Sequence, residues 1–218
     1  WSRRWITQII GVKIKLMKIG ITGSLSSGKS SVAKILSKNK SLFFSADKVV
    51  KNLYLNSSFK KKIRTKFRLQ NKNIKKQIKL KLINREISLK DLASITHPIV
   101  RKKMREFYKK NKTKEIIFFE IPLLIESKLM SYFDFIILVV APRKSRLKRY
   151  LKNGGSKKMF NLLDKNQIAA KKKIKYCDYL IVNNKSKMIL KKKVNDIVGY
   201  VWDIFRYRNH RFIISKKS

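Results

Sequence analysis

Short apolar runs recur along the chain at the spacing of an alternating α/β fold. Five of them have the length and the β-branched or aromatic content of buried strands, at residues 18–22, 42–45, 115–121, 133–140 and 178–182. Strands that are apolar throughout must be covered on both faces. The pattern therefore predicts a parallel sheet between two layers of helices.

Apolar residues at three- and four-residue steps separate these predicted strands. This spacing predicts one helix over residues 31–40 and an amphipathic helix over residues 187–205. Residues 47–111 show the same periodicity but are too long for a single crossover, so we expect an inserted helical subdomain. Pro98 is predicted to open the last helix of this insertion, because proline is favoured in a first helical turn.

These patterns define the expected organisation of the chain. Residues 17–46 and 112–207 would form the core, with the insertion at 47–111. A basic segment broken by Gly154 and Gly155 would form a lid at 143–170. Residues 1–16 precede Met17 and are expected to be an extension outside the fold, and residues 208–218 a basic tail.

A glycine-rich segment lies between the first strand and the helix after it. Its sequence, GSLSSGKS from Gly23 to Ser30, fits G-x-x-x-x-G-K-[S/T]. Such a turn lets backbone N–H groups approach a phosphate, and the helix adds the positive end of its dipole. Lys29 would place a charge on the transferred phosphate, and the Ser30 hydroxyl would ligate Mg²⁺. The alternative is a serine-rich turn that only caps a helix. The predicted nucleotide-binding residues are Gly23, Ser24, Leu25, Ser26, Ser27, Gly28, Lys29, Ser30 and Ser31.

The chain has 56 Lys and Arg against 12 Asp and Glu, a formal net charge of +44 in 218 residues. Such a charge is compatible with nucleic-acid binding. However, the chain is also rich in Ile and Asn, which like Lys have A/T-rich codons, and holds only 7 Gly and 3 Pro. The lysines are scattered, so we attribute the charge mainly to an A/T-biased genome. A single Cys excludes an intrachain disulfide, and no apolar run reaches the roughly 18 residues of a membrane span.

A nucleotide enzyme of this size without the guanine-reading pattern N-K-x-D is more typical of a small kinase than of a GTPase. Such a kinase needs a carboxylate that accepts the proton of the acceptor hydroxyl. Asp47 follows the second strand, at the edge where these sheets bind ligands, and is the first choice. It could instead cap a helix. Glu126 and Glu120 are the other candidates, although Glu120 could orient Mg²⁺ or simply end its strand.

Several motifs follow the phosphate loop in order along the chain. They are SAD at 45–47, ITHPIV at 95–100, IPLLIE at 121–126, VVAP leading to LKR at 139–149, and Q followed by CDYLIVN at 167–183. Together with the loop they resemble the dephospho-CoA kinase family. The loop is shared by many kinases, whereas HP combined with PLL-x-E is specific. The resemblance covers about residues 17–184.

This resemblance implies a three-layer α/β/α P-loop fold with a helical CoA-binding insertion and a mobile lid. It implies ATP-dependent phosphorylation of the ribose 3′-hydroxyl of dephospho-CoA, with ATP and Mg²⁺ as cofactors. Asp47 would be the general base, Lys29 and Ser30 would take the loop roles, and Arg149 would be the lid arginine. We therefore expect a cytoplasmic enzyme with a small-molecule substrate and no specific nucleic-acid or membrane partner.

The chain departs from the family pattern at several positions. Ser45 stands where the first Asp of the D-A-D triplet is expected, and Ser24 and Ser26 replace loop glycines. Asn153 and Leu162 stand where lid arginines usually lie. Loss of an arginine that clamps the transferred phosphate lowers rates by orders of magnitude. Three nearby residues could compensate: Arg143, Arg146 and Lys152.

Three alternatives remain open from the sequence. The chain could be another small-molecule or nucleoside kinase, a kinase that binds ATP but turns over little, or a basic nucleic-acid-binding protein with a vestigial loop.

Four further features have simple structural interpretations. His97 is expected to make a helix-start hydrogen bond, although it could contact substrate. Cys177 is expected to be a small buried residue and Trp202 a packing residue. The lysines at 171–173 are expected to form a solvated helix face.

Overall fold

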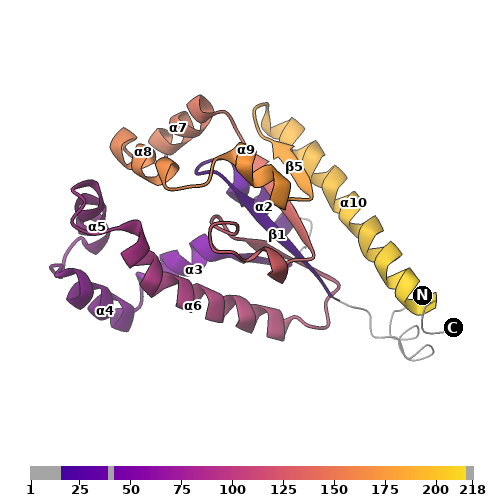
Figure 1. The fold of residues 1–218 in the computed structure, drawn as a ribbon, viewed down its shortest axis with the longest axis horizontal. Coiled ribbons are helices and arrows are strands. Elements are labelled where there is room, and N and C mark those ends of the chain that lie inside the picture. The colour runs from indigo at the N-terminus through magenta and orange to yellow at the C-terminus, as the bar shows by residue number, and fades with distance from the viewer. Residues whose placement is uncertain (1–15, 39–41, 215–218) are drawn as a thin grey trace.

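The computed structural model describes residues 16–38 and 42–214, so most of the predicted extension lies outside the described residues. The described chain forms one sheet covered by helices (Figure 1). The strands are β1 Met17–Gly23, β2 Leu42–Ser45, β3 Ile116–Glu120, β4 Phe135–Val140 and β5 Tyr179–Val182. Their order is β2-β3-β1-β4-β5, and every neighbouring pair is parallel. The predicted α/β class is confirmed.

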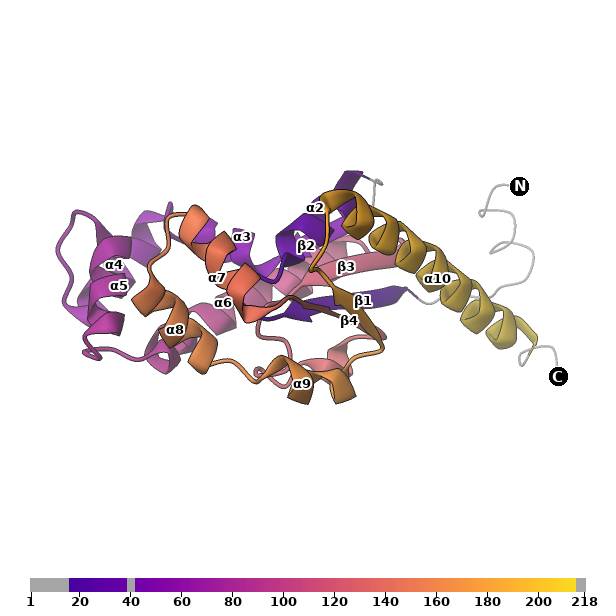
Figure 2. The same ribbon diagram turned by 90° about the horizontal axis from the view of Figure 1, so that it is seen from above.

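Alternating side chains of the strands enter two separate cores. Ile19 and Ile21 of β1 pack on one face against α2 (Lys29–Lys38) and α10 (Lys187–Ile214). On the other face, Phe119 of β3 packs against α6 (Leu89–Lys110). Figure 1 shows α10 above the sheet and α6 below it, and Figure 2 shows α10 extending past the ends of the strands. Because both faces are covered, the strands are apolar throughout, as the sequence pattern required.

The predicted insertion consists of four helices, of which the second and third lie at one end of the molecule, while α6 runs from that end along the sheet (Figure 1). They are α3 Ala46–Leu53, α4 Ser57–Phe67, α5 Ile74–Ile83 and α6. The predicted lid contains α7 Arg143–Lys152 and α8 Lys157–Lys165, followed by α9 Ala170–Lys173. Two 3₁₀ turns, η1 Met130–Tyr132 and η2 Ile174–Tyr176, lie in the remaining connections. In the described part of the chain, no helix is both long and apolar enough to cross a membrane.

The prediction that Pro98 opens a helix is wrong. Pro98 lies inside α6, which begins at Leu89. A capping box starts this helix: the Ser88 side chain accepts from the Asp91 N–H at 3.1 Å, and the Asp91 carboxylate accepts from the Ser88 N–H at 2.9 Å. An interior proline costs about 3 kcal/mol. Burial of Ile95, Thr96 and Met104 on both sides of it keeps the helix continuous.

The C-terminal helix is longer than predicted. α10 continues from residue 205 to Ile214, so residues 208–214 of the expected basic tail are helical, and residues 215–218 lie outside the described residues. Trp202 of α10 packs against the core, as predicted. Its ring meets that of Phe205 edge to face, with centroids 5.7 Å apart.

The lid and the insertion share a third hydrophobic core. Phe59, Ile63 and Ile78 of the insertion are buried together with Met159 of α8. Tyr150 and Leu162 pack against the same cluster. Leu162, which replaces an expected lid arginine, therefore holds the lid to the insertion by apolar contact.

An arginine restored at residue 162 should destabilise the protein. Leu162→Arg would bring a charge into this cluster, at a cost of about 1–3 kcal/mol. For a chain of this size, we expect the melting temperature to fall by roughly 2–10 °C. Leu151→Arg is the matched control, because Leu151 on α7 is 44% exposed. Equal melting temperatures for both variants, measured by circular dichroism, would contradict the apolar contact.

Candidate active site

The phosphate loop needs glycine at its two glycine positions. Gly23 and Gly28 have φ values of +152° and +106°. A Cβ on Gly23 would lie 2.1 Å from the Val139 carbonyl oxygen, and one on Gly28 would lie 2.1 Å from Nδ2 of Asn183. Only a residue without a Cβ fits this close approach.

Ser26 adopts a left-handed conformation, with φ of +55°. A non-glycine residue in this region costs roughly 1–2 kcal/mol. The loss of a loop glycine at this position therefore leaves the turn intact but strained. Ser24 is buried, and its carbonyl accepts the Ser27 N–H at 3.1 Å, which closes the turn.

Lys29 is buried at the centre of the loop. Its Nζ donates to the carbonyl oxygens of Gly23 and Ser24 at 3.0 and 2.9 Å. Burial lowers the pKa of Lys29 to about 8, and the negative charges of Asp47 and Glu120 oppose this shift. Both carboxylates therefore lie close enough to interact with the Lys29 ammonium, the group expected to contact the phosphates.

Two hydroxyls flank the buried Glu120 carboxylate. Ser30 Oγ donates to Oε1 at 3.2 Å, and Ser45 Oγ donates to Oε2 at 2.7 Å. Parallel pairing places Ser45 on β2 beside Glu120 on β3. Mg²⁺ prefers oxygen ligands and retains several waters beside one or two protein groups and phosphates. This oxygen set fits such an ion. No group of three or more His, Cys, Asp and Glu that could hold a metal occurs among the described residues.

Asp47 lies in the first turn of α3, but Ser45 caps that helix. The Ser45 side chain accepts the Lys48 N–H at 3.3 Å. The carboxylate of Asp47 is exposed and borders a mainly apolar cavity. Capping by Ser45 leaves Asp47 available for chemistry.

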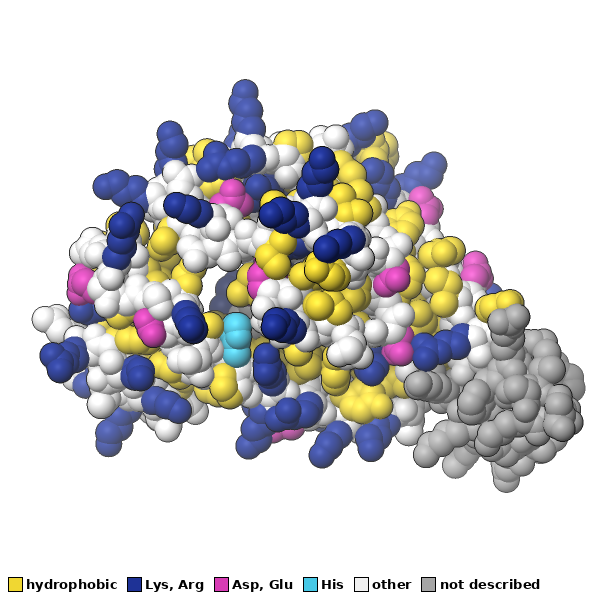
Figure 3. Space-filling model, in the orientation of Figure 1, with side chains coloured by type: hydrophobic (Ala, Val, Ile, Leu, Met, Phe, Trp, Pro, Cys, Tyr) yellow, Lys and Arg dark blue, Asp and Glu magenta, His cyan; other side chains and the backbone are white. Residues whose placement is uncertain are grey.

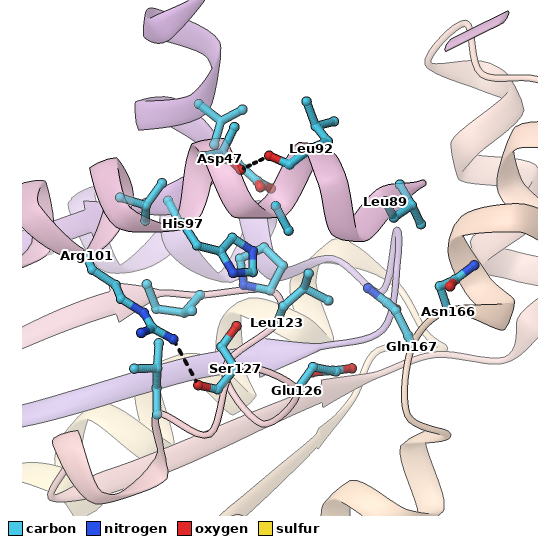
Figure 4. Close-up of a pocket in the computed structure, with 18 of the residues that line it drawn as sticks. Asp47, Leu89, Leu92, His97, Arg101, Leu123, Glu126, Ser127, Asn166 and Gln167 are labelled. Carbon is cyan, nitrogen blue, oxygen red and sulfur yellow. Dashed lines mark hydrogen bonds between the residues drawn. The ribbon is translucent and has the colours of Figure 1, made fainter. Parts of the chain in front are cut away.

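This cavity, which we call the acceptor pocket, has a volume of about 570 Å³. Figure 4 shows Asp47 on one side, His97 and Arg101 on α6, and Glu126 and Gln167 across from them. Apolar walls come mainly from α6 and from the PLL-x-E segment: Leu89, Leu92, Val100, Met104, Pro122 and Leu123. His97 is the ninth residue of α6, so its predicted helix-start role is wrong and it lines the pocket instead. Leu25 of the phosphate loop also borders the pocket, so the pocket and the phosphate loop adjoin each other.

Arginines of α7 hold the carbonyl groups of the phosphate loop. Arg149 donates to the Ser27 carbonyl at 3.2 Å and to the Asn183 carbonyl at 3.0 Å. Arg146 is buried, donates to the Leu25 carbonyl at 3.3 Å and pairs with Asp164 of α8. The two arginines are three residues apart, and this spacing in the sequence predicts that they lie on the same face of the helix. Arg146 thus links the phosphate loop to α8.

Two amide side chains complete the support of the loop. Gln167 Oε1 accepts the Leu25 N–H at 2.8 Å, and Asn183 Nδ2 donates to the Ser27 carbonyl at 2.8 Å. Both residues belong to the motifs that follow the lid. The other departure, Asn153, ends α7 beside Gly154 and has an exposed side chain.

The prediction of a solvated lysine face at 171–173 is wrong for Lys173. Its side chain is fully buried, and Nζ lies 2.7 Å from Glu126 Oε1. Glu126 Oε1 also accepts the Ile168 N–H at 3.1 Å. Glu126 is thus a paired acid that anchors the segment after the lid. Lys171 and Lys172 are exposed, as expected, and nothing in the local sequence distinguishes them from Lys173.

Cys177 is half-buried, in partial agreement with the prediction. Burial raises the pKa of its thiol to about 11, and the charge of Asp178 adds to the effect. The thiol donates to the Lys173 carbonyl at 3.3 Å.

A parallel sheet, a phosphate loop, a helical insertion and a lid that together enclose an acceptor pocket define a P-loop kinase. Several solved structures share this fold. The structure of TT1252 from Thermus thermophilus has a TM-score of 0.69 and 23% identity, and covers 85% of this chain and 98% of that one. Dephospho-CoA kinase from Campylobacter jejuni has a TM-score of 0.57 and 24% identity, covering 84% and 96%. Shikimate kinase from Acinetobacter baumannii shares the fold at a TM-score of 0.52 and 13% identity, covering 85% and 94%.

The chain belongs to the dephospho-CoA kinase family, whose model matches residues 17–188. It is 30% identical over 187 residues to dephospho-CoA kinase of Fusobacterium nucleatum, covering 83% of this chain and 96% of that protein. It is 32% identical over 174 residues to dephospho-CoA kinase of Bartonella henselae, covering 77% and 89%. The predicted family is confirmed.

Affinity for ATP should fall as the pH rises through about 8, the pKa of Lys29 in the free protein. Below this pH the ammonium is charged and attracts the phosphates, whereas above it the neutral amine does not. If only the protonated form binds, affinity falls by up to about tenfold per pH unit. Isothermal titration calorimetry from pH 7 to 9.5 measures this.

Lys29→Met is the control for this titration. It should bind ATP weakly, with no fall in affinity over the same pH range. A fall in this variant as steep as that of the unmodified protein would remove Lys29 from the effect.

Proposed function

We propose that this protein transfers the γ-phosphoryl group of ATP to the ribose 3′-hydroxyl of dephospho-CoA, giving CoA and ADP. One juxtaposition carries the proposal: Asp47 and Leu25 of the phosphate loop border the same pocket. A nucleoside that enters this pocket can present a hydroxyl to Asp47 and to a nucleotide on the loop. Membership of the family favours this acceptor over that of another small kinase.

The loop residues 23–31 would bind the triphosphate. Their backbone N–H groups and the N-terminus of α2 offer donors and a positive dipole. The Lys29 ammonium would leave the Gly23 and Ser24 carbonyls for the phosphate oxygens, which are stronger acceptors. This exchange of partners would couple nucleotide binding to the shape of the loop.

The Ser30 hydroxyl would bind Mg²⁺, and Glu120 would hold the hydroxyl or a water of the ion. The ion would neutralise charge on the phosphates when it is bound. Ser45, which stands at the position of the missing triplet Asp, donates a hydrogen bond to the same Glu120 carboxylate. Glu120 thus supplies the buried charge at this corner.

Asp47 would accept the proton of the 3′-hydroxyl while the hydroxyl oxygen bonds to the γ-phosphorus and the bond to the β,γ-bridging oxygen breaks. Arg149, with Arg146 beside it, would hold the loop and contribute positive charge near the transferred group. We place this reaction in the cytoplasm, with dephospho-CoA as the partner and no requirement for nucleic acid.

Release of ADP tests the proposal. The purified protein with Mg-ATP should release ADP only when dephospho-CoA is present, and Lys29→Ala should abolish the release. Bound ATP without release would point to another acceptor or to a kinase with little turnover. Affinity for RNA that is indifferent to Lys29→Ala, without ATP binding, would overturn the proposal in favour of a basic nucleic-acid-binding protein.

Asp47→Asn should lower kcat by about 10²–10⁴, the usual contribution of a general base. The amide keeps the size of the side chain but cannot take the proton. Affinity for ATP, measured by calorimetry, should change less than about threefold. Asp203→Asn is the matched control, because the Asp203 side chain is 72% exposed on α10. Unchanged turnover in Asp47→Asn would remove Asp47 from the mechanism.

A further inference from the structure

A groove beside the acceptor pocket is lined by cationic side chains of α6. Lys90, His97, Arg101 and Arg105 recur at steps of seven, four and four residues, which places them along one side of the helix. We call these four residues the cationic row. The groove has a volume of about 610 Å³, and its lining is completed by Ala93, Ser94 and Pro98.

The groove is continuous with the acceptor pocket. Lys90, Ala93, His97 and Arg101 line both. Figure 4 shows His97 and Arg101 on the side of α6 that faces the PLL-x-E segment, where Arg101 donates to the Ser127 carbonyl at 3.4 Å. Figure 3 shows a hollow on this face bordered by a histidine and by lysine and arginine side chains. An elongated ligand can therefore extend from the pocket into the groove.

Within the described residues, the side chains of the row form no ion pair with an acid, although Asp47 also lines the adjoining pocket. None of the residues that line the groove is acidic. The two acids of α6 are engaged elsewhere: Asp91 bonds to Ser88, and Glu106 pairs with Lys103 at 2.9 Å. Glu126 of the adjoining pocket is paired with the buried Lys173.

His97 responds to this local field. Burial lowers its pKa, and the positive charge of Arg101 lowers it further. The imidazole therefore lies next to a guanidinium, at the junction of a mainly apolar pocket and a basic groove. An anionic ligand would relieve this repulsion.

We propose that the cationic row binds the diphosphate of the acceptor. This inference rests on the proposed function, which places the acceptor's ribose hydroxyl at Asp47. Dephospho-CoA carries its diphosphate on the 5′ carbon of that same ribose. The diphosphate must therefore bind within one nucleotide length of the 3′-hydroxyl. Arg101 lies where pocket and groove meet, and a guanidinium can make two hydrogen bonds to phosphate.

The alternative reading is that the row is one more part of a basic surface. The two readings differ in which acceptors they affect. A diphosphate site strengthens the binding of only those acceptors that carry the diphosphate. A general positive field attracts every anion, including ATP.

Two acceptors with the same hydroxyl test the inference: dephospho-CoA and adenosine, which lacks the diphosphate. In Arg101→Gln, kcat/KM for dephospho-CoA should fall about 10- to 100-fold, the range for a lost hydrogen bond to a charged group. The loss should be an increase in KM, with kcat nearly unchanged. The values of kcat/KM for adenosine and of KM for Mg-ATP should change less than about threefold. Arg105→Gln should show the same pattern more weakly.

Arg206→Gln is the matched control, because this arginine on α10 has a 75% exposed side chain far along the chain from the groove. It should leave both acceptors unaffected. An equal loss for dephospho-CoA and adenosine in Arg101→Gln would overturn the inference in favour of a structural role. No loss for either acceptor would overturn it as well.

A binding measurement separates this inference from the proposed function. With the phosphate loop saturated by a non-hydrolysable ATP analogue and Mg²⁺, calorimetry gives the affinity for each acceptor. The protein could fail to transfer phosphate while Arg101→Gln still weakens the binding of dephospho-CoA and not that of adenosine. This result would overturn the proposed function and leave the diphosphate site standing. Equal binding of dephospho-CoA by Arg101→Gln and the unmodified protein would overturn the diphosphate site.

Discussion

The site depends on how the carbonyl oxygens of the phosphate loop are held. The carbonyls of Gly23 and Ser24 accept from Lys29, that of Leu25 from Arg146, and that of Ser27 from Arg149 and Asn183. Each donor except the Asn183 amide carries a positive charge, and hydrogen bonds to charged groups are the stronger ones. The loop can therefore keep its turn although two of its expected glycines are serines.

The lid of this chain is held by two kinds of contact. Arg146 pairs with Asp164 and reaches the phosphate loop, while Leu162 and Met159 pack into the core of the insertion. The leucine that replaces a lid arginine thus gains apolar burial where a charge would be costly. The positive charge near the loop comes from Arg146 and Arg149 of α7. Within the lid, α8 therefore packs against the insertion, and α7 brings charge to the phosphate loop.

The excess of positive charge has different consequences at different depths. On the surface, most lysines are exposed and solvated, which is compatible with a biased codon usage. Inside, Lys29 and Lys173 are each placed by carbonyl or carboxylate groups, because an unpaired buried charge is strongly destabilising. Along α6 the cationic row faces an open groove without acids, and there the charge is available to a ligand.

The sequence alone determined the strands, the phosphate loop and the family, because these follow from hydrophobic periodicity and from motifs that are local in the chain. Pro98 was misplaced because burial on both sides of it outweighs a local propensity. The tertiary structure alone decided that Glu120 faces Ser30 and Ser45, that Lys173 is buried while its neighbours are exposed, and that Arg146 reaches Leu25. These contacts join residues that are far apart in sequence, and they exist only because the strand order β2-β3-β1-β4-β5 brings the carboxyl ends of the strands to one edge.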